Sequence, residues 1–226
     1  MKTVAVIPAY NEERRISASI KDVRKFVDEV VVVDDGSRDQ TAQQALLAGA
    51  CVLPHIINRG QGAALETGTQ YALEILDADI VVHFDADGQM SGEDIPRIVE
   101  PIIRGEADVV LGSRFLGLQS NMPFTRLLTL HLALLFTILV SGIRVTDTHN
   151  GFRALSRQAA QEIRITMNRM AHASEILDLI KVKKLRFVER PVTIRYSQET
   201  LQKGMSFFSG FSVLKDYFKG KFFDEV

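Results

Sequence analysis

The sequence is poor in the features that mark a disulfide scaffold or a nucleic-acid binder. Cys51 is the only cysteine among 226 residues, which excludes an internal disulfide and a zinc site built from several cysteines. The formal net charge of -1 provides no overall field for attracting nucleic acid, so we expect no nucleic-acid partner. The apolar stretch at the N-terminus is short and runs into charged residues, so we expect no targeting segment. These properties favour a cytoplasmic protein.

The remaining composition is that of a folded globular domain, with 46% hydrophobic and 24% charged residues. Four short apolar runs, "TVAVIPA", "EVVVVDDG", "ADIVVHFDAD" and "ADVVLGSRF", predict buried strands. Helical patterns separate them; Ile16, Ile20, Val23 and Val27, for example, recur at spacings of four and three. Alternating strands and helices predict one α/β domain with a mostly parallel central sheet flanked by helices.

Polar residues follow the predicted strands, in "PAYNEE", "DDGSRDQT", "DADGQ" and "GSRF". In wound α/β sheets, ligands bind beyond the carboxyl ends of the strands, so these residues are candidates for a site. Asp34 and Asp35, with Gly36 and Ser37, suit either a turn and helix cap or hydrogen bonds to the base or ribose of a nucleotide.

Asp85 and Asp87 are the candidate ligands of a divalent metal. Alternate residues of an extended strand face the same side, so the two carboxylates can converge, and Gln89 repeats the spacing if the extension persists. Mg²⁺ and Mn²⁺ favour oxygen ligands and commonly combine one or two carboxylates with substrate phosphates. A capping role for the aspartates is weaker, because Ser91 and Asp94 are nearer to the next predicted helix.

Other signals are weaker when taken alone. The segment "NRGQGAALETG", which contains Gly62, has glycines where the backbone could approach a ligand, but it equally suits a flexible entry into a helix. Four scattered histidines lack the spacing of metal ligands and favour structural roles: His55, His83, His131 and His172.

The motifs "PAYNEE", "VVDDGSRDQT", "NRGQGAALETG", "DADGQ", "GSRF" and "DTHNGFRA" occur in the order found in family 2 glycosyltransferases. The chain resembles this family over about positions 3 to 196, and most resembles its dolichol-phosphate-mannose-synthase-like branch. The resemblance implies the Rossmann-like GT-A fold, a nucleotide-sugar donor, a polyprenyl-phosphate acceptor and Mg²⁺ or Mn²⁺. It also implies roles for these residues: Pro8, Tyr10, Glu12, Asp34 and Asp35 for the nucleoside; Asp85, Asp87 and Gln89 for metal and diphosphate; Arg114 and Arg126 for the acceptor phosphate; and Lys203 in a loop over the donor. Asp147 is implied near the acceptor and Arg153 ends the same motif, and both are candidate catalytic residues with Arg114. His149 and Asn150 depart from many relatives.

The reaction expected from this resemblance is inverting transfer, in which the acceptor oxygen attacks the anomeric carbon as the nucleoside diphosphate leaves. A phosphate acceptor is already ionised and needs orientation by arginines, whereas a hydroxyl acceptor would need a base, for which Asp147 is the candidate. A sugar-1-phosphate nucleotidyltransferase is disfavoured because "IPAYNEERR" lacks a glycine-rich loop. A non-catalytic nucleotide-sugar-binding subunit is the remaining alternative.

Two apolar segments raise the question of membrane contact. Residues 127–143 are uncharged, but at ~1.5 Å per residue they reach about 25 Å, short of the ~30 Å hydrocarbon core, so we expect no spanning helix. We divide the chain into a transferase domain, 1–204, and an amphipathic C-terminal helix, 205–226. On that helix Phe207, Phe211, Leu214 and Phe218 share one face beside lysines, which suits core packing, a homo-oligomer contact or peripheral binding to the inner face of the cell membrane.

Overall fold

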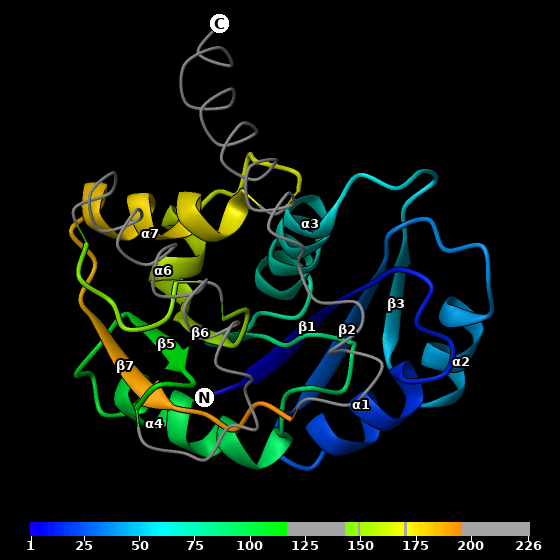
Figure 1. Cartoon of the computed structure of the whole chain (residues 1–226), viewed down its shortest axis with the longest axis horizontal. Helices are drawn as coiled ribbons and strands as arrows, with labels where there is room; N and C mark the ends of the chain where they lie inside the picture. The colour runs from blue at the N-terminus through cyan, green and yellow to red at the C-terminus, as the bar shows by residue number, and fades with distance from the viewer. Residues whose placement is uncertain (117–142, 149, 170, 196–226) are drawn as a thin grey trace, which may run out of the picture.

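A computed structural model describes residues 1–116, 143–148, 150–169 and 171–195 (Figure 1). Helices and strands alternate over the first half of the chain, as the sequence predicts. The elements are β1 (Thr3–Ala9), α1 (Ile16–Val23), β2 (Glu29–Asp34), α2 (Thr41–Leu47), β3 (Cys51–Pro54), α3 (Gln61–Glu74), β4 (Ile80–His83), the 3₁₀ helix η1 (Gly92–Asp94), α4 (Ile95–Ile103), β5 (Val109–Ser113), β6 (Arg153–Ser156), α6 (Arg157–Glu162), α7 (His172–Val182) and β7 (Phe187–Pro191).

The strands form one seven-stranded sheet in the order β3-β2-β1-β4-β6-β5-β7. β1 pairs in parallel with β2 and β4, and β5 pairs in parallel with β7. β6 is antiparallel to both of its neighbours, β4 and β5. All the described strands except β6 therefore point the same way, which confirms the predicted mostly parallel α/β sheet.

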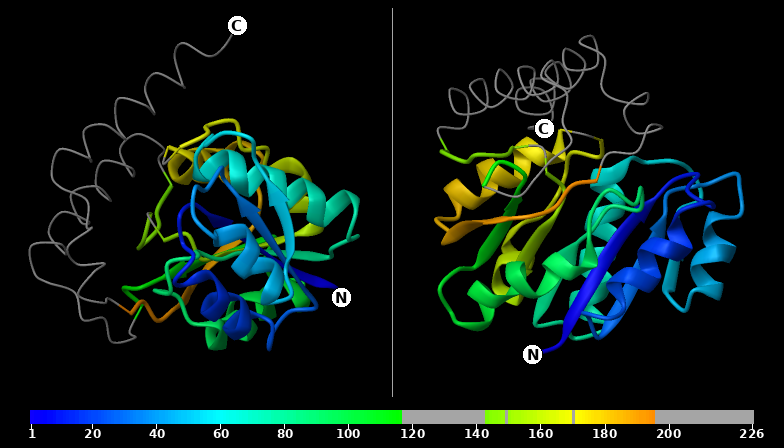
Figure 2. Two further views of the ribbon diagram at one scale, coloured as in Figure 1. Left: turned by 90° about the vertical axis from the view of Figure 1, so that its right-hand side faces the viewer. Right: turned by 60° about the horizontal axis from the view of Figure 1, so that its bottom comes forward.

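Helices cover both faces of this sheet, so the strands are apolar on both sides (Figure 2). Alternation along β1 sends Ala5 and Ile7 to one core, which they share with residues of α1, α2 and α4. Val4 and Val6 point to the other core, which is completed by α3, α6 and α7. Burial on both faces explains why these strands read as continuous apolar runs.

The predicted first helix forms at Ile16–Val23 and buries Ile16, Ile20 and Val23, while Val27 lies beyond its end. Strand β4 is shorter than the run "ADIVVHFDAD" suggested, since it ends at His83. Within the described residues no helix is long and apolar enough to cross a membrane. Residues 127–143 and the predicted helix 205–226 lie outside the described ranges, and the division at residue 204 stays a prediction.

Candidate active site

The topology brings the predicted motifs to one edge of the sheet. β1, β2 and β4 are parallel, and β5 is parallel to β4 because both are antiparallel to β6. The residues that follow these strands therefore meet at the same edge. Since β6 runs the other way, its first residue, Arg153, also lies there, paired opposite His83 of β4 and Leu111 of β5. No apolar run in the sequence indicated this antiparallel strand.

Asp85 and Asp87 lie in a turn after β4, where the sequence predicted a continuing extended strand. Ala86 is buried in the core, Ala86 and Asp87 form the turn, and Gly88 has a positive φ of 74°, so the extended conformation does not continue to Gln89. Gln89 donates to Asp87 from its backbone nitrogen, at 3.0 Å to Oδ1, and from its side-chain amide, at 2.8 Å to Oδ2. The three predicted metal-site residues are therefore neighbours, although not through strand alternation.

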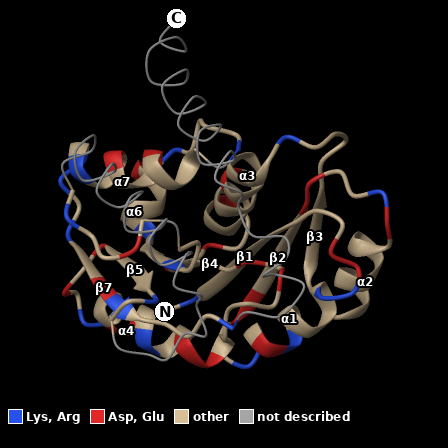
Figure 3. Ribbon diagram, viewed as in Figure 1, with Lys and Arg blue, Asp and Glu red and all other residues tan. Residues whose placement is uncertain are grey.

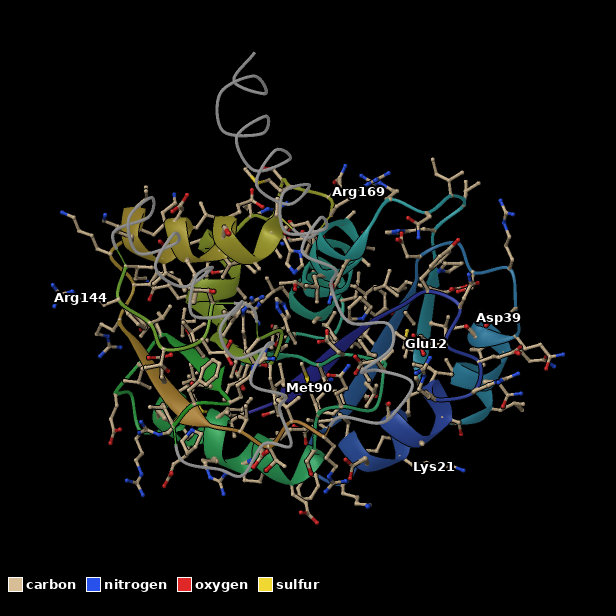
Figure 4. The ribbon with its side chains drawn as sticks, in the orientation of Figure 1. Glu12, Lys21, Asp39, Met90, Arg144 and Arg169 are labelled. Atoms are coloured by element: carbon tan, nitrogen blue, oxygen red, sulfur yellow. The ribbon has the colours of Figure 1, made fainter. Side chains whose placement is uncertain are left out.

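The turn concentrates negative charge in a half-buried place. Burial, followed by repulsion from Asp87, raises the pKa of Asp85 to about 7. Burial also raises the pKa of Asp87. Gln61, the first residue of α3, donates from Nε2 to Asp85 Oδ1 at 2.8 Å. The Asp85 backbone nitrogen donates at 3.3 Å to Sδ of Met90, which is labelled in Figure 4. Gln61 belongs to the segment "NRGQGAALETG", but no sequence pattern predicted its contact with the acidic pair.

These residues suit a divalent cation, because the two carboxylates repel each other and the cation would neutralise them. In the described part of the chain no cluster of three or more His, Cys, Asp or Glu side chains could hold a metal by itself. Asp85, Asp87 and the amide oxygen of Gln89 would therefore supply part of the coordination shell. Phosphate oxygens of a substrate would complete it.

Arg153 is a buried cation beside this turn, and its Nη1 has no hydrogen-bond partner among the described residues. Burial lowers its pKa to about 10, against the attraction of Asp85 and Asp147. Burial, followed by the charge of Arg153, lowers the pKa of His83 to about 3 and that of His172 to about 4. Both histidines are therefore neutral near pH 7, and their structural roles stay a prediction.

Arg114 and Asp147 form a charged pair at the end of β5. Arg114 donates to Asp147 Oδ2 from Nε at 2.6 Å and from its backbone nitrogen at 3.1 Å. The Asp147 side chain is 1% exposed. Arg114 is also near enough to Asp85 to act against the rise of that pKa. The structure thus brings together the acidic turn and three residues predicted to act near the acceptor: Arg114, Asp147 and Arg153.

The predicted nucleoside residues lie at the ends of β1 and β2. Pro8 is buried within β1, whereas Tyr10 is exposed just beyond it. Glu12 forms an ion pair with Arg15 at 2.7 Å. Asp34 is buried at the end of β2, where its Oδ1 accepts from the Ser37 backbone nitrogen at 3.2 Å. Binding of a nucleoside by these residues stays a prediction.

Asp35 has a different environment from its neighbour. Its Oδ1 accepts from the Arg59 backbone nitrogen at 2.9 Å and contacts His55 Nδ1 at 2.7 Å, and its Oδ2 accepts from the Gly60 backbone nitrogen at 2.7 Å. The carboxylate is buried, and both of its oxygens contact residues of the loop between β3 and α3. The structure therefore gives Asp35 a loop-holding role that its place in "DDGS" did not reveal.

Gly62 faces the protein interior. A Cβ at this position would lie 2.0 Å from the carbonyl oxygen of Met167. Because glycine has no side chain, α3 can pack closely against that segment. Contact between the Gly62 backbone and a ligand stays a prediction. Arg126, His149 and Lys203 lie outside the described residues.

Known proteins resemble this chain in fold and in sequence. The crystal structure of Mycobacterium tuberculosis glucosyl-3-phosphoglycerate synthase with Mn²⁺ and UDP-glucose superposes with a TM-score of 0.70 at 21% identity, covering 95% of this chain and 75% of that one. The UDP-N-acetylglucosamine–dolichyl-phosphate N-acetylglucosaminyltransferase of Methanococcus voltae is 33% identical and covers 92% of this chain and 91% of that protein. The undecaprenyl-phosphate mannosyltransferase of Micrococcus luteus is 30% identical, with coverages of 85% and 83%.

The fold and these relatives define a sugar-transferring enzyme with a GT-A-like sheet. The model of glycosyl transferase family 2 matches residues 4–164, and the chain belongs to this family. It is a glycosyltransferase, in agreement with the resemblance carried by its motifs.

Proposed function

We propose that the chain is a metal-dependent, inverting glycosyltransferase that transfers a sugar from a nucleotide-sugar donor to a polyprenyl phosphate. The observation that carries this proposal is the arrangement at one sheet edge of an acidic turn, Asp85 to Gln89, and an arginine held by a carboxylate, Arg114 and Asp147. The acidic turn suits a cation bound to the donor diphosphate, and Arg114 suits the phosphate of the acceptor.

The donor end of the proposal rests on the acidic turn. A bound Mg²⁺ or Mn²⁺ would neutralise the charge that develops on the departing nucleoside diphosphate. Asp85 and Asp87 would hold this ion, with Gln61 fixing the orientation of Asp85 through its 2.8 Å hydrogen bond. The solved synthase that shares this fold was crystallised with Mn²⁺ and UDP-glucose, which supports a comparable role here.

The acceptor end rests on Arg114. A phosphate acceptor is ionised at neutral pH, so it needs orientation and charge stabilisation more than a general base. Asp147 accepts one hydrogen bond from the guanidinium Nε of Arg114 and one from its backbone nitrogen, so both the side chain and the backbone of this arginine are held in place. Relatives from Methanococcus voltae and Micrococcus luteus are named for dolichyl phosphate and undecaprenyl phosphate, and this supports a polyprenyl phosphate.

A hydroxyl acceptor would require Asp147 to act as the base. Its 1% exposed side chain and its bonds to Arg114 favour a positioning role instead. In the proposed reaction, the acceptor phosphate oxygen attacks the anomeric carbon from the face opposite the leaving diphosphate, and the configuration is inverted. Positive charge on the sugar would then resemble that in glycoside hydrolysis.

The first experiment compares Asp87→Ala with Glu93→Ala, which removes an exposed carboxylate nearby. Transfer of radiolabelled sugar to a polyprenyl phosphate is measured with Mn²⁺, with Mg²⁺ and with a chelator. We expect a loss of about a hundredfold or more for Asp87→Ala and for chelated wild type, and near-normal rates for Glu93→Ala. A near-normal rate for Asp87→Ala would contradict the proposed metal site.

The second experiment identifies the donor. UDP, GDP and dTDP sugars are screened for metal-dependent thermal stabilisation, because a ligand that binds only the native state raises its apparent stability. We also propose a cytoplasmic location with peripheral attachment to the inner face of the membrane. This places the enzyme where a soluble donor and a lipid-linked acceptor can both reach it, and fractionation with and without residues 205–226 tests the contribution of the tail.

A further inference from the structure

The loop between β3 and α3 presents two isoleucines to solvent. Ile56 is 100% exposed and Ile57 is 68% exposed. The loop follows the carboxyl end of β3, which is parallel to β2, so it lies at the same edge of the sheet as the candidate active site (Figure 1). Isolated apolar side chains are common on protein surfaces, but two adjacent exposed isoleucines suggest a contact surface.

The loop is fixed from beneath, so the exposed isoleucines are presented by an ordered backbone. Asp35 accepts hydrogen bonds from the backbone nitrogens of Arg59 and Gly60, and His55 Nε2 lies 3.0 Å from Thr67 Oγ1. A Cβ at Gly36 would lie 2.8 Å from the backbone nitrogen of Asn58, which shows how closely the two turns pack. An ordered loop loses little conformational entropy when it docks on a partner.

Positive charge flanks the isoleucines. Arg59 is exposed on the loop itself, and Figure 3 shows the basic segment there. Arg169 is also exposed, and its Cγ would lie 2.9 Å from a Cβ at Gly60, so its side chain begins beside the loop (Figure 4). Apolar side chains next to arginines match an interface in which acyl chains lie beneath anionic headgroups.

We propose that residues 54–60 dock the enzyme on an anionic bilayer, with Ile56 and Ile57 in the interface and Arg59 and Arg169 against headgroup phosphates. This inference rests on the proposed polyprenyl-phosphate acceptor, because that substrate is held in a membrane. Docking through this loop turns the carboxyl edge of the sheet toward the bilayer. The acidic turn and Arg114 then lie on the side from which a lipid-linked phosphate arrives.

The test is co-sedimentation of the full chain with vesicles of phosphatidylcholine, with and without phosphatidylglycerol. The variant is Ile56→Asp/Ile57→Asp, and the matched control is Leu46→Asp/Leu47→Asp. The control pair is 60% and 75% exposed, at the end of α2 on the opposite edge of the sheet. We expect the loop variant to bind phosphatidylglycerol vesicles about tenfold more weakly and the control to bind as wild type does.

A second pair of measurements tests the charges. Arg59→Gln/Arg169→Gln should weaken binding to phosphatidylglycerol vesicles by about thirtyfold, because each arginine near anionic lipid contributes about 1 kcal/mol and the pair about 2 kcal/mol. The weak binding to pure phosphatidylcholine should stay unchanged. Equal binding of the loop variant and wild type to both vesicles would overturn the proposal. So would a loss of self-association in the loop variant without any change in vesicle binding, since a second copy would then be the partner.

Transfer to a short-chain, water-soluble polyprenyl phosphate separates this inference from the proposed function. If the loop variant keeps wild-type rates on the soluble acceptor but loses about tenfold on acceptor in vesicles, the loop acts in docking. If the wild type uses the soluble acceptor, and the loop and arginine variants transfer to acceptor in vesicles as fast as the wild type does, the docking proposal fails while the proposed function stands. Absence of any transfer by the wild type to either acceptor would instead refute the proposed function.

Discussion

Replacing Asp35 by asparagine tests whether this buried carboxylate holds the loop between β3 and α3. Asp35 Oδ1 accepts from the Arg59 backbone nitrogen and contacts His55 Nδ1, and Oδ2 accepts from the Gly60 backbone nitrogen. Asparagine has nearly the same shape but only one acceptor oxygen. If that oxygen takes the place of Oδ1, the new amide group faces the Gly60 N–H, and two donors are left pointing at each other.

The expected cost follows from these contacts. Hydrogen bonds to a charged group contribute about 1.5–3 kcal/mol each, and an unsatisfied buried donor costs about 1–3 kcal/mol. The asparagine variant loses the hydrogen bond from Gly60 N–H, and its remaining hydrogen bonds are to a neutral acceptor instead of a charged one. Together these losses give a destabilisation of about 2–4 kcal/mol. For a domain of this size, each kcal/mol lowers the Tm by about 2–4 °C, so we expect a drop of roughly 10 °C.

The assay is thermal unfolding of the two proteins without ligand, with Glu100→Gln as the control. Glu100 is 49% exposed and pairs with Arg104 on the surface of α4, so its replacement should cost about 0.5 kcal/mol or less. An unchanged Tm for Asp35→Asn, together with a large loss of affinity for a nucleoside diphosphate, would refute the loop-holding role. It would support the nucleoside contact predicted from the sequence.

Three further outcomes follow from the site. In metal-free protein the pKa of Asp85 is raised to about 7 from an ordinary 3.8, so the contribution of this group to stability falls as the pH rises from about 4 to about 7. Between pH 4 and pH 7.5 the free energy of unfolding of Asp85→Asn, measured in melts with chelator, should therefore rise by up to about 4 kcal/mol relative to wild type. A difference that stays constant with pH would contradict this. Gly62→Ala should cost about 1–3 kcal/mol in urea unfolding, because its Cβ would collide with the Met167 carbonyl; an unchanged midpoint would show that the helix shifts freely. Arg114→Lys should raise the KM for polyprenyl phosphate about tenfold and leave the donor KM unchanged, whereas equal effects on both would argue against an acceptor role.

Much of the fold could be read from the sequence because its strands are buried on both faces. The predicted strand "TVAVIPA" matches β1, and the runs that predicted β2, β4 and β5 contain those strands. β6 and β7 gave no comparable signal: "RALS" is short, and "FVERP" carries two charges, so neither forms an apolar run. Because β6 has no apolar run, the sequence did not predict the one antiparallel strand among the described strands.

The chemical groups at the site follow from the order of residues along the chain, because the residues that end parallel strands must meet at one edge of the sheet. The family also follows from it, through several motifs in one order. How those groups pair depends on the three-dimensional fold. Arg114 and Asp147 are separated by 33 positions, and Asp35 and Gly60 by 25, so no local spacing predicts their bonds. Such contacts depend on strand order and on the direction of β6, which are set by packing of the whole domain.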